Sequence, residues 1–206
     1  MMPPAAAEWI EEPTTPPTDQ RVIVHGVSWA SYCLMRELLD SPGIRLSYLE
    51  GALEIMSPSR RHEYLKKVIA RLVEVFAEER DIPLEGYGST TFRREARERG
   101  LEPDECYVID AELRDAPDIA IEVVLTSGGL DKLSIYAGLG VREVWFWRKE
   151  RFEIPSLEGA AYQAVPGSRL IPTLDFEQLA TVVRGHQRQH AAVKAYRALL
   201  RTPPHA

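Results

Sequence analysis

The sequence predicts an α/β (α+β) protein with a central mixed β-sheet flanked by helices. Residues 118–125 are almost continuously apolar, which is typical of a strand covered on both faces. Residues 130–139 suit a short helix and residues 141–147 a second buried strand, so this part of the chain has the order of a βαβ crossover. Residues 60–80 carry apolar side chains at helical spacing, and we expect that helix to pack on the sheet.

The elements before the long helix are shorter. Apolar residues recur at helical spacing over residues 27–39, and Ser28 can cap the start of that helix. Residues 45–49 and 52–56 are two extended runs separated by a glycine-containing pair, which favours a β-hairpin with a tight turn.

The other elements follow from the same patterns. We expect a flexible, proline-rich tail over residues 1–20 and one domain over residues 21–206. Further strands are expected at residues 84–87, 90–94 and 105–109, an edge hairpin within residues 151–174, and closing helices at residues 175–183 and 191–200.

Composition limits the function. The net charge is -6 and the pI is about 5.5, which argues against a module that binds nucleic acid by bulk charge, although a local basic strip remains open. The two cysteines, Cys33 and Cys106, give neither a metal spacing nor a disulfide framework. No apolar run is long enough to cross a bilayer and the start lacks signal-peptide features, so we expect a cytoplasmic protein without a membrane partner.

Glu122 is the residue that stands out chemically, because it interrupts the apolar run 118–125. A carboxylate in a buried strand is unfavourable unless it is paired or binds a cation. One alternative is a structural glutamate bonded to an arginine. Asp118 lies on the same face of the strand, but about 13 Å away at ~3.3 Å per residue, so it cannot share an ion with Glu122.

Asp104 is the better partner for Glu122. It stands where a neighbouring strand begins, and a short return connection can bring it beside the glutamate. Two hard oxygen ligands with water suit Mg²⁺ or Mn²⁺. Lys132, at the start of the next helix, can aim its ammonium at the carboxylates, where it would hold a water or stabilise charge on a phosphate. A surface lysine is the alternative.

Three segments carry a family resemblance: LEGALEIMSPSRRHEYLKKVIARL, GSTTFRREARERGLEPDECYVID and APDIAIEVVLTSGGLDKLSIYAGLGVREVWFW. Together they resemble the Uma-two family of bacterial restriction endonucleases, which is similar to the PD-(D/E)XK nuclease superfamily. The resemblance covers residues 21 to about 180. It implies a restriction-endonuclease-like core, with Asp104 as the motif aspartate, Glu122 at the (D/E) position and Lys132 as the lysine.

The chain departs from the superfamily pattern at one place. The lysine or other polar residue expected two positions after the glutamate is replaced by Val124. The resemblance also singles out His62, which would bind substrate or tune a carboxylate, with a capping or solvated role as the alternative.

Two basic strips could contact DNA, and a solvated surface is the alternative for both. They consist of Arg60, Arg61, Lys66, Lys67 and Arg71 on the long helix, and Arg93, Arg94, Arg97 and Arg99 before the predicted site.

Two functions therefore stay open. The first is a metal-dependent endonuclease that hydrolyses phosphodiester bonds in DNA, for which a homodimer would suit the cutting of two strands. The second is a nuclease-fold protein without cleavage that serves as a binding or assembly module. Val124 and the acidic charge favour the second function, whereas Asp104, Glu122 and Lys132 favour the first.

Overall fold

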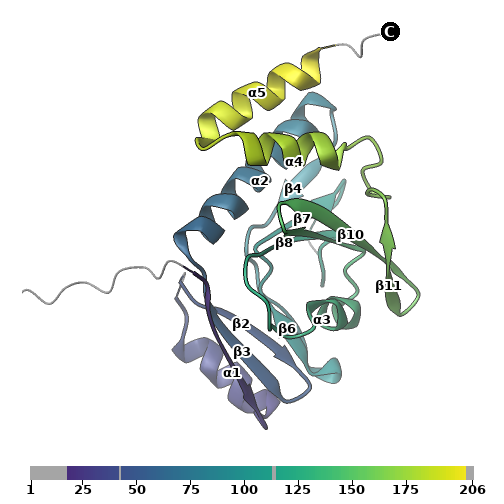
Figure 1. Cartoon of the computed structure of the whole chain (residues 1–206). Helices are drawn as coiled ribbons and strands as arrows, with labels where there is room; N and C mark the ends of the chain where they lie inside the picture. The colour runs from purple at the N-terminus through teal and green to yellow at the C-terminus, as the bar shows by residue number, and fades with distance from the viewer. Residues whose placement is uncertain (1–17, 42, 113–114, 203–206) are drawn as a thin grey trace, which may run out of the picture.

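The computed structural model describes residues 18–41, 43–112 and 115–202, and in them the chain forms two β-sheets and five α-helices (Figure 1). The predicted tail falls mostly outside the described residues. Its last part does not: Asp19 is buried and Gln20 begins the first strand, so the predicted boundary at residue 20 lies inside the folded body.

The N-terminal sheet has the strand order β1-β3-β2-β6-β5, and every neighbouring pair is antiparallel. Helix α1 (Trp29–Leu38), capped by Ser28, packs on it through Tyr32, whose ring stacks on that of Tyr48 with centroids 4.9 Å apart. Its strands are β1 (Gln20–His25), β2 (Arg45–Leu49), β3 (Ala52–Ser57), β5 (Phe92–Arg94) and β6 (Arg99–Leu101).

The turn between β2 and β3 explains why these strands form a hairpin. Glu50 and Gly51 both have positive φ, at 45° and 90°, as in the two-residue turns that match the twist of paired strands. The predicted hairpin is thus confirmed, although it belongs to a separate sheet. The strands β1 and β6 were not predicted.

The central sheet has the order β11-β10-β9-β8-β7-β4. Strands β8 and β9 are parallel and the other pairs are antiparallel, which confirms a mixed sheet. Its strands are β4 (Leu84–Gly86), β7 (Glu105–Ile109), β8 (Ile119–Val124), β9 (Glu143–Arg148), β10 (Arg151–Glu158) and β11 (Ala161–Val165).

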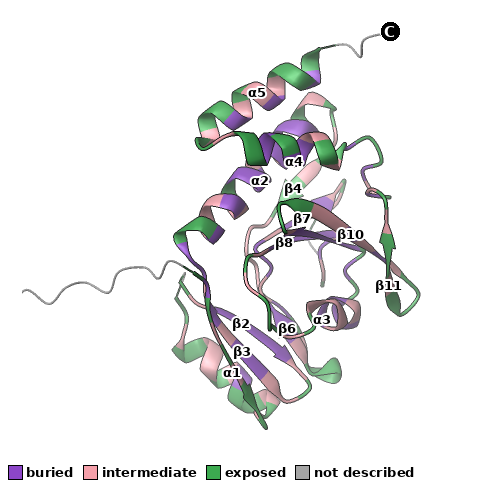
Figure 2. Ribbon diagram, in the orientation of Figure 1, coloured by how far each residue is buried: buried purple, intermediate pink, exposed green. Residues whose placement is uncertain are grey.

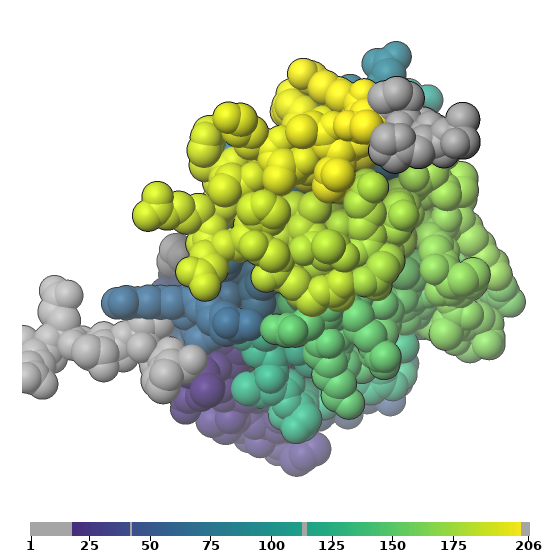
Figure 3. Space-filling model, turned by 45° about the horizontal axis from the view of Figure 1, so that its top comes forward, coloured from purple at the N-terminus to yellow at the C-terminus, as the bar shows by residue number. Residues whose placement is uncertain are grey.

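Helices cover both faces of the central sheet. On one face lie α2 (Arg60–Glu79), α4 (Phe176–Gly185) and α5 (Gln189–Arg201), and Figure 3 shows the two C-terminal helices, in yellow and yellow-green, spread over the molecule. On the other face lies α3 (Lys132–Leu139), beside strands β2, β5 and β6 of the N-terminal sheet. A short 3₁₀ turn, η1 (Glu95–Arg97), joins β5 to β6. The predicted helix over residues 60–80, packed on one face, is confirmed.

Strand β8 alternates between the two cores. Ile119, Ile121 and Val123 pack toward α2, whereas Ala120 belongs to the core beneath α3. Figure 2 shows this strand as buried. The alternation places Glu122 on the α3 face, because neighbouring side chains along a strand point to opposite sides. Within the described residues, no helix is both long and apolar enough to span a membrane.

Candidate active site

The register of β7 and β8 brings the two predicted carboxylates together. Glu105 pairs with Ile121 in an antiparallel ladder, and one further step sets Asp104 opposite Glu122. Side chains of directly opposite residues share a face of the sheet. The backbone N–H of Val123 donates to Asp104 Oδ2 over 2.7 Å, which fixes that carboxylate at the junction. Both residues are buried, with 3% and 0% of their surface exposed.

Helix α3 supplies the partners of Glu122. Asp131 caps the helix by accepting from the Ser134 N–H, so that α3 begins at Lys132. The Lys132 ammonium donates to Glu122 Oε2 over 2.5 Å, as expected of a lysine aimed back at the site. One turn later the Tyr136 hydroxyl donates to Glu122 Oε1. Tyr136 was not predicted from the sequence, although its i+4 spacing from Lys132 is the signal that places both on one helix face.

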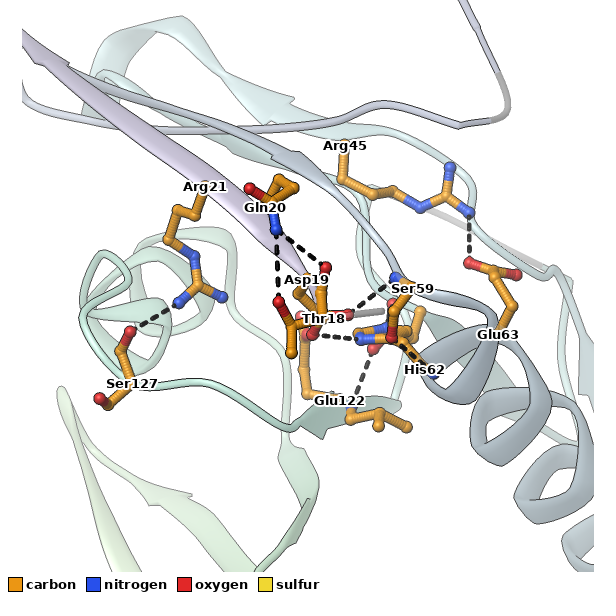
Figure 4. A network of polar contacts seen from close by, with 12 residues as sticks. Thr18, Asp19, Gln20, Arg21, Arg45, Ser59, His62, Glu63, Glu122 and Ser127 are labelled. Carbon is orange, nitrogen blue, oxygen red and sulfur yellow. Dashed lines mark hydrogen bonds and ion pairs between the residues drawn. The ribbon is translucent and has the colours of Figure 1, made fainter. Parts of the chain in front are cut away.

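His62 bridges the site to the beginning of the chain. It lies in the first turn of α2, where Ser59 is the helix cap, and its side chain is fully buried. Nε2 lies 2.9 Å from Asp104 Oδ1, and Nδ1 lies 3.0 Å from Asp19 Oδ2 (Figure 4). A solvated role for His62 is therefore wrong. A capping role is wrong too, because the side chain that caps α2 is that of Ser59.

The charged groups of the site shift one another's pKa values. Burial alone would lower the pKa of His62, but its hydrogen bonds to Asp104 and Asp19 raise it to about 9. Burial opposes ionisation of Asp104, yet the His62 contact holds the pKa of that carboxyl below its ordinary value. Burial raises the pKa of Glu122, and the negative charge of Asp104 adds to this shift while Lys132 opposes it. His62 is thus a cation at neutral pH.

A second buried glutamate, missed by the sequence analysis, fastens the loop between β8 and α3. Glu54 on β3 has 1% of its surface exposed. Its Oε2 accepts from the Leu130 N–H over 2.9 Å and lies 3.2 Å from Arg21 Nε. The same arginine donates from Nη1 to the Ser127 carbonyl over 3.2 Å. The N-terminal sheet therefore holds the segment that leads from Glu122 to Lys132.

A cleft of about 760 Å³ opens at the carboxyl ends of β8 and β9, and Lys132 lies in its wall. Cationic side chains gather at its rim, where Arg61 is 67% exposed and Arg148 is 42% exposed. Lys149 also lines it. Acidic residues reduce this charge, since Glu150 pairs with Arg61 over 3.7 Å.

The residues of the two predicted basic strips have different surroundings in the structure. Arg61 reaches the cleft, but Arg94 and Arg99 donate to the backbone carbonyls of Gly138 and Ser134 and thus fasten α3. On α2, Lys66 pairs with Glu63 over 2.6 Å. Two of the four arginines of the second strip therefore have a structural role.

Asp118 and Val124 lie at the two ends of β8. Asp118 accepts from the Ile109 N–H and from Arg142, at the start of the strand and four residues from Glu122, as predicted. Val124 is half-buried and lines the cleft at the other end of β8. The position where a polar group was expected is thus an apolar wall beside the carboxylates.

The donor chemistry of the site fits a hard divalent cation. Within residues 18–41, 43–112 and 115–202, no cluster of three or more acidic, histidine or cysteine side chains has the arrangement of a metal site. Mg²⁺, however, is often held by one or two carboxylates together with water and substrate phosphate. The four carboxylate oxygens of Asp104 and Glu122 each accept from one protein donor. Each keeps a second lone pair for a cation.

Two comparisons with known proteins found matches. Residues 29–184 match the Uma2 family, described as "Putative restriction endonuclease". A solved structure from Anabaena variabilis ATCC 29413, titled as a "putative nuclease belonging to DUF820", is similar at 15% identity and a TM-score of 0.48, covering 72% of this chain and 98% of that chain. No curated protein matches. Because the family match spans more than half of the sequence, the chain belongs to the Uma2 family.

Proposed function

We propose that this protein is a Mg²⁺- or Mn²⁺-dependent endonuclease that hydrolyses phosphodiester bonds in DNA. The observation that carries the proposal is the Lys132 ammonium, which donates to Glu122 and lines a cleft rimmed by cations. Such an ammonium, held by a buried carboxylate, is placed to face a phosphate that enters the cleft. The family description supports the same class of reaction.

The residues would divide the work as follows. Asp104 and Glu122 would hold the cation, which when bound supplies Lewis-acid polarisation of the phosphate. Lys132 keeps two further N–H donors after bonding Glu122, and these would orient the attacking water or stabilise charge on the phosphate oxygens. Tyr136 fixes the second oxygen of Glu122 so that the carboxylate cannot rotate. Arg61, Arg148 and Lys149 would attract the DNA backbone.

The second candidate function is a binding or assembly module of the nuclease fold. Val124 favours it, because the superfamily pattern places a polar group there. The chain's net charge of -6 also favours it, since it opposes binding of DNA outside the cleft.

The test is cleavage of supercoiled, linear duplex and single-stranded DNA with Mg²⁺, with Mn²⁺ and with chelator. We expect metal-dependent cleavage that Glu122→Ala abolishes and Lys132→Ala strongly reduces. Asp118→Asn is the matched control, because Asp118 lies near the start of the strand that carries Glu122 and should leave cleavage unchanged. If wild-type protein that is folded by circular dichroism cuts none of these substrates, the nuclease proposal is wrong and the binding or assembly function replaces it. Equal loss in Asp118→Asn would contradict the site.

A further inference from the structure

The candidate site contains a buried carboxylate that the proposed reaction does not use. Asp19 lies at the head of β1, in the N-terminal sheet, and its side chain is 1% exposed. It makes two contacts with α2: Oδ1 accepts from the Ser59 N–H over 2.8 Å, and Oδ2 lies 3.0 Å from His62 Nδ1. Figure 4 shows Asp19, Ser59 and His62 meeting at the beginning of the helix.

The other ring nitrogen of His62 continues this chain of contacts to Asp104. Nε2 lies 2.9 Å from Asp104 Oδ1, so a carboxylate stands at each end of one imidazole ring. An imidazole bonded at a single nitrogen can still swing about its χ angles. Bonds at both nitrogens fix the plane of the ring and therefore the direction from which Asp104 is held.

We propose that Asp19 is a positioning residue for the candidate centre, which through His62 fixes the Asp104 carboxylate that would bind the divalent cation. The inference rests on the proposed function. Asp19 itself touches neither DNA nor the cation; it sets the orientation of the ring that contacts Asp104.

Removal of Asp19 acts on the cation site through the His62 ring. Without Asp19 the ring loses its second anchor, so Asp104 would sample orientations that do not bind the cation. This loss of order weakens metal binding. Loss of an outer-shell partner of a metal ligand typically lowers affinity by about 10–100-fold.

The alternative explanation of Asp19 is a purely structural role, since Asp19 also accepts from the Ser59 N–H at the start of α2. Ser59→Ala separates the two explanations. It removes the hydroxyl that caps the His62 N–H at the same helix end, but leaves the ring contacts to Asp19 and Asp104 intact. A structural role of Asp19 would make Asp19→Ala behave like Ser59→Ala.

The experiment is calorimetric titration of the full chain with Mn²⁺ alone, without DNA, together with urea unfolding of each variant. We expect Asp19→Ala to weaken Mn²⁺ binding by about 10–100-fold. Ser59→Ala should keep wild-type affinity while unfolding at lower urea. Asp19→Asn should restore most of the affinity, because its amide oxygen can still accept from the Nδ1–H and anchor the ring.

A second variant covers the case in which Asp19→Ala does not fold. In His62→Gln the amide can bond one carboxylate but cannot bridge two, so we expect weakened Mn²⁺ binding there as well. Wild-type affinity in folded Asp19→Ala or in His62→Gln would overturn the positioning role while leaving the nuclease proposal intact. A wild-type protein that binds no Mn²⁺ would overturn both.

Discussion

The two sheets each contribute a buried glutamate with a cationic partner, and the two pairs differ in what their cations hold. In the central sheet, Glu122 is bonded to Lys132, the first residue of α3. In the N-terminal sheet, Glu54 pairs with Arg21 and accepts from a backbone N–H of the loop that leads to Lys132. Both cations line the cleft, but Arg21 also donates to the Ser127 carbonyl, so the second pair fastens the segment that carries the first.

The lesson is that burial and charge alone do not mark a catalytic carboxylate. Glu54 and Glu122 have 1% and 0% of their surface exposed, so they cannot be told apart by burial. They differ in what surrounds them. The Glu54–Arg21 pair bonds the Leu130 N–H and the Ser127 carbonyl of the loop, whereas Glu122 accepts from two side chains of α3, Lys132 and Tyr136.

The largest expected effect is on turnover and compares the two cations directly. Lys132→Gln should lower the rate of DNA cleavage by about 100–1,000-fold, as loss of a donor to a developing charge does. Arg21→Gln, the matched change in the other pair, should lower it by less than about 10-fold. Single-turnover rates at saturating metal give the comparison. Equal losses in both variants would show that Lys132 acts only by holding the loop.

The second prediction concerns the stability of the Glu122–Lys132 pair. Lys132→Met should lower the free energy of unfolding by about 2–4 kcal/mol, somewhat less than a fully buried pair, because it leaves the glutamate uncompensated. Lys132 is 16% exposed, which limits the loss. The double variant Glu122→Gln with Lys132→Met should recover most of it. Urea unfolding of the four proteins measures the coupling, and additive losses would show that the pair is screened by solvent.

The central sheet could be predicted from the sequence because its signals are strong. An apolar run broken by one carboxylate indicated both β8 and Glu122, and a proline before a second strand indicated Asp104. The distance to Asp118 followed from the rise of a strand alone. Lys132 was identified because a helix that follows a parallel strand begins near the end of that strand.

The supporting residues could not be predicted in the same way. Asp19 follows a proline-rich stretch, where an acidic residue is ordinary, and its burial depends on the tertiary contact with His62. Glu54 alternates with apolar residues in β3, as a solvent-facing side chain would. Strand β1 pairs with the distant β3, so no local turn signalled it. Asp19, Glu54 and β1 were therefore missed because their partners are remote in sequence.

The third prediction is a pH dependence that arises at His62. A group whose pKa rises on folding stabilises the fold below its unfolded pKa and loses that contribution as the pH passes its folded pKa. For His62 these values are 6.5 and about 9. The free energy of unfolding should therefore fall by about 3 kcal/mol from pH 6.5 to pH 9, beyond any change in His62→Gln. The measurement is urea unfolding in chelator. A wild-type curve parallel to that of His62→Gln would contradict the buried imidazolium.

The smallest expected effect tests the Glu54–Arg21 pair through two neighbouring glycines of the loop. A Cβ on Gly129 would lie 2.8 Å from Glu54 Oε2 and 3.2 Å from Arg21 Cζ, so Gly129→Ala must displace the pair. Gly128 has φ +88°, and a Cβ there would meet no atom within 4 Å, so Gly128→Ala would strain only the backbone. Each change should lower the free energy of unfolding by about 1–2 kcal/mol.

Combination with Arg21→Gln separates the two glycines, because only contacting residues deviate from additivity. Once Arg21 is shortened, the Gly129 methyl group finds room, so the loss from Gly129→Ala should shrink by about 0.5 kcal/mol or more. The loss from Gly128→Ala should stay the same, since backbone strain does not depend on that side chain. Urea unfolding of the single and double variants measures both values. If the losses in free energy of unfolding from both glycine changes simply add to the loss from Arg21→Gln, then Arg21 does not hold the loop. The proposed difference between the two glutamate pairs would then be wrong for the Glu54–Arg21 pair.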